Sequence, residues 1–186
     1  MEDPSSKNTR VSSATFGYWN INGHRSKYLG DKLIDAEFLN VINECDIIGL
    51  GELQSEEKVD IPGFKRIEQK IRDKNFLGPK VAGGVGVFVK KNFEDRVEFI
   101  PNTCDDSIWI WIKDEESLGT YYVSPRYSSA GDIDFLNTLN KEISQFSSKG
   151  KVFVQGDLNA RTSTDPDFVQ VGKHPDSYEE EMDEHS

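Results

Sequence analysis

Residues 151–161 have the sequence KVFVQGDLNAR, a run of alternating apolar residues that ends in glycine, aspartate and asparagine. The alternation predicts a β-strand, and Gly156 predicts that the backbone turns where the strand ends. Asp157 and Asn159 would then stand at the carboxyl end of the strand, where a carboxylate and an amide can bind a hard cation or orient a water molecule. The same Gly-Asp-Leu-Asn is also typical of a turn without a chemical role. Other stretches of the chain decide between these interpretations.

Two earlier stretches also place polar residues after a strand. Residues 15–23 are prone to β-structure and end in Asn-Gly, and the apolar residues 47–51 are followed at once by Glu52. Between them, Asp31 is expected to cap a helix over residues 32–45, whose apolar residues form one stripe. Strand, helix and strand in this order predict a right-handed βαβ unit with parallel strands. Asn20 and Glu52 would then lie at strand carboxyl ends, where open α/β sheets bind ligands.

The rest of the chain predicts further strands and one more helix. Strands are expected at residues 85–89, 97–100, 107–112 and 119–123, and an amphipathic helix at residues 132–146. Trp109 and Trp111 share one face of a strand, which favours packing in the core over a platform for stacking bases. Residues 1–13 are expected to be a disordered lead-in and residues 165–186 an acidic tail, which leaves one domain over residues 14–164.

Composition places few limits on function. The 186 residues suit one domain, and their net charge of −11 is concentrated in residues 157–186, which hold 9 acidic and 2 basic residues. A basic run is either a solvated face or a phosphate contact; it comprises Lys65, Arg66, Lys70, Arg72, Lys74 and Lys80. The overall charge is therefore only weak evidence against binding to DNA.

The two cysteines, Cys45 and Cys104, lack the spacing of metal ligands and are expected to be structural thiols of a reduced protein. No signal peptide or membrane-spanning run is visible. We therefore expect an intracellular protein, in the nucleus or the cytoplasm.

Glu52 and Asp157, each after a strand, together form a candidate site for Mg²⁺, which prefers a few carboxylate oxygens and keeps water for a substrate to replace. Alone, Glu52 would be a surface acid. Tyr122 stands at a fourth strand end and is a further candidate.

In their order along the chain, WNING at residues 19–23, Gly51-Glu52 and GDLNAR at residues 156–161 resemble the motifs of the endonuclease/exonuclease/phosphatase superfamily, which has a DNase I-like fold. The resemblance covers residues 14–165 and is closest to the apurinic-like endonuclease domains encoded by non-LTR retrotransposons. It implies an α/β four-layer αββα sandwich. It also implies hydrolysis of phosphodiester bonds in DNA with Mg²⁺, or with Mn²⁺ in its place.

The resemblance assigns a role to each candidate. Glu52 would be the principal Mg²⁺ ligand, and Asn20 would help to position the metal or the phosphate. Asp157 would orient or deprotonate the attacking water, and Asn159 would hold the scissile phosphate. Tyr122 matches a family tyrosine that precedes a proline-containing loop, although a register shifted by one residue would put Val123 there instead.

One part of the family pattern is missing. Family members complete the site with a later Ser-Asp-His motif, whereas the histidines here are His24, His174 and His185, and no strand precedes the last two. The resemblance therefore implies that the C-terminal strands are absent, unless a partner supplies them. This leaves three functions open: a DNA endonuclease of retrotransposon origin, an inactive remnant that acts as a binding module, and a phosphatase acting on a small phosphodiester or a phosphoinositide. The chain contains no reverse-transcriptase segment.

Overall fold

The computed structural model describes residues 14–28, 30–71, 83–102, 104–113, 116–122 and 135–158. The expected lead-in and acidic tail lie outside these residues, as do residues 132–134 of the expected second helix. The elements in chain order are β1 (Phe16–Asn20), β2 (Arg25–Ser26), β3 (Gly30–Asp31), η1 (Lys32–Ile34), α1 (Ala36–Ile42), β4 (Ile47–Gly51), β5 (Phe64–Lys70), β6 (Val85–Lys90), η3 (Lys91–Arg96), β7 (Val97–Ile100), β8 (Ser107–Ile112), β9 (Glu116–Tyr122), α2 (Phe135–Ser147) and β10 (Lys151–Asp157).

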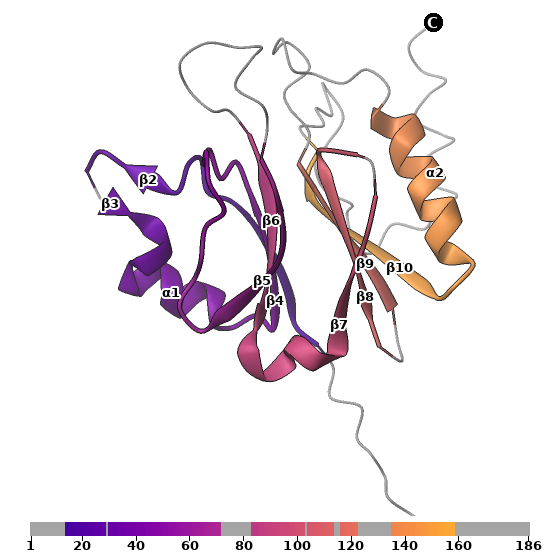
Figure 1. Cartoon of the computed structure of the whole chain (residues 1–186), viewed down its shortest axis with the longest axis horizontal. Coiled ribbons are helices and arrows are strands. Elements are labelled where there is room, and N and C mark those ends of the chain that lie inside the picture. The colour runs from indigo at the N-terminus through magenta and orange to yellow at the C-terminus, as the bar shows by residue number, and fades with distance from the viewer. Residues whose placement is uncertain are drawn as a thin grey trace, which may run out of the picture.

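Two sheets form the centre of the described structure. The first has the strand order β1-β4-β6-β5 and the second the order β10-β9-β8-β7, while β2 and β3 pair separately. β1 and β4 are parallel, as are β9 and β10, and the other neighbours are antiparallel. The sheets face each other, with α1 outside the first and α2 outside the second (Figure 1). The predicted four-layer αββα sandwich is confirmed.

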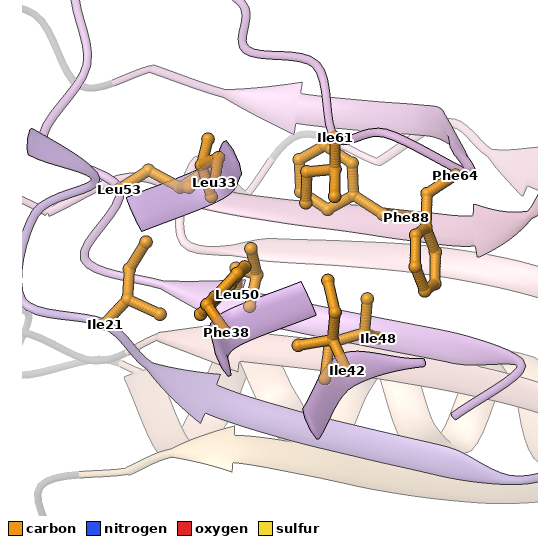
Figure 2. Close-up of a cluster of buried hydrophobic side chains, with 10 residues drawn as sticks. All are labelled: Ile21, Leu33, Phe38, Ile42, Ile48, Leu50, Leu53, Ile61, Phe64 and Phe88. Carbon is orange, nitrogen blue, oxygen red and sulfur yellow. The ribbon is translucent and has the colours of Figure 1, made fainter. Parts of the chain in front are cut away.

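The first sheet is buried on both faces, which explains why β4 and β6 are almost wholly apolar. One face of it packs against β8 in the space between the sheets; the buried residues there include Ile47, Val87, Val89, Ile108 and Ile110. The other face packs against α1, where Phe38 and Ile42 lie over Ile48 and Leu50 (Figure 2).

A third apolar cluster joins α2 to the second sheet. The Trp109 ring is fully buried and packs against Phe146 of α2, with ring centroids 4.5 Å apart. Leu139 belongs to the same cluster. The prediction of core packing is therefore confirmed for Trp109, whereas Trp111 is only partly buried.

The expected single helix over residues 32–45 is wrong, because the structure divides it at Asp35. Asp31 caps the short η1 helix, and the Asp35 carboxylate accepts hydrogen bonds from the backbone amides of Glu37 and Phe38, both at 3.0 Å, to begin α1. An aspartate caps a new helix better than it continues an old one. The division lets Leu33 and Phe38 reach the same core cluster.

Strand boundaries also differ from the expectation. Residues 64–70, where no strand was predicted, form β5, whose register shifts between Arg66 and Glu68. Such a bulge breaks the apolar alternation by which a strand is recognised. β9 begins at Glu116, three residues earlier than expected. No helix in the described ranges has the length and apolarity needed to cross a membrane.

Candidate functional site

Four of the predicted site residues lie at one edge of the two sheets. Asn20 ends β1 and pairs in register with Gly51, so Glu52 follows immediately on the neighbouring strand. Asp157 ends β10 and pairs in register with Tyr122 at the end of β9. Both strand pairs are parallel, so in each sheet two carboxyl ends meet at the same edge. The fifth residue, Asn159, lies outside the described residues.

A side-chain hydrogen bond joins the two sheets at this edge. Asn20 Nδ2 donates to Asp157 Oδ2 at 2.8 Å, between residues 137 positions apart in the chain. The other end of the same amide is also used, because Asn20 Oδ1 accepts from the Asn22 backbone N–H at 3.0 Å. With both ends held, the amide fixes the position of the Asp157 carboxylate, and a hydrogen bond to an ionised group is stronger than a neutral one.

Backbone strain is concentrated in the loops that follow β1 and β4. Within the described ranges, the non-glycine residues with positive φ are Asn22 (47°), Glu52 (50°) and Gln54 (49°). This left-handed conformation costs an ordinary residue about 1–2 kcal/mol and persists only where the surroundings enforce it. Strain of this kind collects at functional sites, and sequence patterns gave no sign of it at Glu52 or Gln54.

Hydrogen bonds between the two loops enforce that conformation. The Gly23 N–H donates to the Glu52 carbonyl at 2.6 Å, and Gln54 Nε2 donates to Asn22 Oδ1 at 3.2 Å. The Gln54 N–H also donates to the Gly83 carbonyl beside β6, at 2.8 Å. Glu52 is therefore held on a rigid backbone at the edge where Asn20 and Asp157 meet.

Tyr18 lies beneath this edge on β1 and was not predicted from the sequence. Its hydroxyl is buried and has no hydrogen-bond partner among the described residues. Burial raises the pKa of Tyr18 well above its usual range, and the negative charges of Asp157 and Glu52 add to the rise. The nearby Asp157 backbone partly offsets this rise in the Tyr18 pKa. Its geometry relative to the Tyr18 hydroxyl falls short of a hydrogen bond. The charges of both carboxylates thus affect the pKa of one phenol. The alternation of side chains along β1, which puts Tyr18 on the same face as Asn20, was the sequence signal that could have identified it.

The chemistry of these donors fits a magnesium ion. Mg²⁺ is usually bound by one or two carboxylates and completes its shell with water and substrate phosphates, and Glu52 and Asp157 supply two carboxylates at one edge. No group of three or more His, Cys, Asp or Glu side chains within the described part of the chain could enclose a metal ion.

The basic run is engaged with the protein itself wherever the structure describes it. Lys65 pairs with Glu94 at 3.5 Å, and Arg66 pairs with Asp60 at 2.7 Å. Lys70 Nζ donates to Asn102 Oδ1 at 2.7 Å. Because Lys65, Arg66 and Lys70 already have partners within the protein, these contacts favour the solvated face over the phosphate contact. Its other members, Arg72, Lys74 and Lys80, lie outside the described residues.

A four-layer αββα sandwich with carboxylates at the carboxyl ends of parallel strands defines an α/β protein with a candidate ligand site at the sheet edge. The chain belongs to the Endonuclease/Exonuclease/phosphatase family, whose sequence profile matches residues 17–173. It is similar to the structure of an AP endonuclease from Archaeoglobus fulgidus, with 19% sequence identity and a TM-score of 0.48. The match covers 82% of this chain and 60% of that one, so this chain spans about three fifths of the length of that protein. No curated protein sequence matches it significantly.

Proposed function

We propose that this chain is a metal-dependent phosphodiesterase that cleaves DNA as an endonuclease. The observation that carries the proposal is the hydrogen bond between Asn20 and Asp157, which fixes a carboxylate between the two sheets. A second carboxylate, Glu52, stands on strained backbone at the same edge. Membership in the family supports phosphodiester hydrolysis as the reaction.

Each residue has a role in this proposal. Phosphoryl transfer needs charge neutralised on the phosphoryl oxygens and an aligned nucleophile, with little covalent help from the protein. Glu52 would hold Mg²⁺, or Mn²⁺, and a bound divalent ion neutralises phosphoryl charge. Asp157 would orient the attacking water and accept its proton. Asn20 donates to Asp157 in the structure, so in the proposal it orients that carboxylate.

Tyr122 and Asn159 complete the proposed site as contacts to the scissile phosphate. The backbone of Tyr122 is the register partner of Asp157 at the end of β9, which supports this role. DNA as the substrate, and a retrotransposon origin, rest on the resemblance of residues 156–161 to the endonuclease domains of non-LTR retrotransposons.

The test is nicking of supercoiled plasmid by the full chain with Mg²⁺, alongside an EDTA control. Glu52→Gln and Asp157→Asn remove one charge each and should lower the nicking rate by at least about a hundredfold. Glu44→Gln is the matched control, because Glu44 is an exposed acid that lies before β4, at the opposite end of that strand from Glu52. Nicking that persists in both site variants, or in EDTA, would refute the proposal.

A binding module without hydrolysis is the competing function. One observation favours it: the histidine that the structure describes, His24, is buried in the loop after β1 and pairs with Asp31 at 3.4 Å. It is therefore already engaged away from the Asn20–Asp157 pair. A folded chain that retains plasmid in a Mg²⁺-dependent mobility shift but never nicks it would establish this alternative. Hydrolysis of a small phosphodiester or a phosphoinositide, with no action on plasmid, would instead support a phosphatase.

A further inference from the structure

β1 holds Tyr18 between two contacts that join the sheets. Side chains alternate along a strand, so Phe16, Tyr18 and Asn20 share one face of β1. On that face, the Phe16 ring stacks on Phe153 of β10 with centroids 6.1 Å apart, and Asn20 bonds to Asp157. Tyr18 lies between these contacts along the strand. Its ring therefore enters the space between the sheets directly below the Asn20–Asp157 pair.

The Tyr18 hydroxyl is costly where it stands. It is buried and has no hydrogen-bond partner among the described residues. Every other buried side-chain nitrogen or oxygen atom of the described residues has a partner. A buried polar group without a partner costs about 1–3 kcal/mol. Phenylalanine would fill the same space without that cost. A polar atom kept in such a position calls for an explanation in the chemistry of the neighbouring site.

The Tyr18 hydroxyl lies within the electrostatic influence of two carboxylates. Burial raises the pKa of Tyr18, the charges of Asp157 and Glu52 add to the rise, and the Asp157 backbone partly opposes it. An ordinary phenol is protonated at neutral pH in any case. The hydroxyl is thus a hydrogen-bond donor beside the two carboxylates of the proposed site. A carboxylate has room for more than one donor, and the structure already provides one in Asn20.

We propose that Tyr18 is a positioning residue whose hydroxyl donates a second hydrogen bond to the Asp157 carboxylate when the site is engaged. The inference rests on the proposed function of that site. Two donors from one face of β1 would restrict the orientation of the carboxylate towards the attacking water more tightly than the Asn20 amide does alone. Supporting hydrogen bonds of this kind orient the groups that perform the chemistry.

The test variant is Tyr18→Phe, which removes only the hydroxyl. The melting temperature should stay the same or rise, because an unpartnered buried group is lost. The kcat for plasmid nicking should fall by about tenfold with KM unchanged, the size expected for one hydrogen bond to an ionised group. Tyr28→Phe is the matched control, because Tyr28 is 89% exposed and should change neither quantity.

A spectroscopic measurement tests the contact without turnover. Donation by a phenol shifts its near-ultraviolet absorption, so Mg²⁺ and a phosphorothioate oligonucleotide should produce a tyrosine difference spectrum that is smaller in Tyr18→Phe than in the wild type. This loss of signal supports the inference even if the wild type never nicks plasmid, a result that would defeat the nuclease proposal alone.

Three results would overturn the inference about Tyr18. The first is equal kcat in the wild type and Tyr18→Phe, which leaves the nuclease proposal intact. The second is a lower melting temperature in Tyr18→Phe, since the hydroxyl would then already be satisfied in the fold. The third is the same difference spectrum in both proteins.

Discussion

Glu52 occupies a backbone conformation that ordinary side chains avoid, with φ at 50°. Its carbonyl accepts the Gly23 N–H at 2.6 Å, and the Leu53 N–H donates to the Gly84 carbonyl at 3.3 Å, so the backbone has little freedom to relax. The position after β4 therefore combines strain with a carboxylate. A residue chosen for stability alone would be glycine, which adopts positive φ at no steric cost.

We predict that Glu52→Gly is more stable than Glu52→Ala by about 1 kcal/mol, because only glycine relieves the left-handed strain. Both variants lack the carboxylate, so both should lose nicking. Urea unfolding of the two proteins measures the difference, and the comparison needs no assumption about the glutamate itself. An alanine variant as stable as the glycine variant would show that the backbone at this position is not strained.

At the scale of elements, a buried carboxylate attaches α2 to the second sheet. Glu142 is only 8% exposed, and three donors converge on it. Asn102 Nδ2 and Trp109 Nε1 lie 2.8 Å from its oxygens, and Ser107 Oγ lies at 3.1 Å. Ser107 begins β8 and pairs in register with Tyr121, beside Tyr122 at the site edge. Since β10 follows α2 in the chain, this attachment also anchors the strand that carries Asp157.

We predict that Glu142→Gln lowers the free energy of unfolding by about 1–3 kcal/mol, because an amide nitrogen would then face a donor. Glu142→Ala should cost more, since it leaves all three donors without this acceptor. Lys141→Gln is the control, because Lys141 is the exposed neighbour on the same helix. Urea unfolding measures all three, and equal stability of Glu142→Ala and the control would contradict the prediction.

At the scale of the whole molecule, both sheets have an apolar edge on the same side. Among the described strands, β1 and β10 each end the strand order of their sheet, and they lie next to each other. Trp19 on β1 is 40% exposed, and Phe153 and Val154 on β10 are 44% and 37% exposed. Successive residues of a strand point to opposite faces, so β10 shows apolar surface on both of its faces.

Edge strands of this kind pair with other strands, and any strand supplied by a partner would use the same edges. We predict that the isolated chain associates with itself as its concentration rises. Val154→Lys should suppress that association, because a charge on an edge strand opposes pairing. Ile34→Lys, on an exposed apolar residue of η1, is the control. Sedimentation velocity over a range of concentrations measures the effect; a wild type that stays monomeric throughout would contradict the prediction.

The strands that could be predicted from the sequence are those with a regular pattern of apolar residues. The apolar alternation or continuity of residues 47–51, 85–89 and 151–157 located three strands, because side-chain periodicity follows directly from strand geometry. Where the pattern was interrupted, the prediction failed. The bulge in β5 hid a strand, and Asp35 divided a helix that looked continuous.

By itself, the sequence determined the family, the parallel pairing of β1 with β4 and the placement of Asn20, Glu52 and Asp157 at strand ends, because each can be read from short motifs and from their order along the chain. Only the tertiary structure decided that Asn20 bonds to Asp157, that the Tyr18 hydroxyl is buried beneath them and that Glu142 anchors α2. These contacts join residues on different elements. They depend on how two twisted sheets and a helix stack, which periodicity along the chain does not encode.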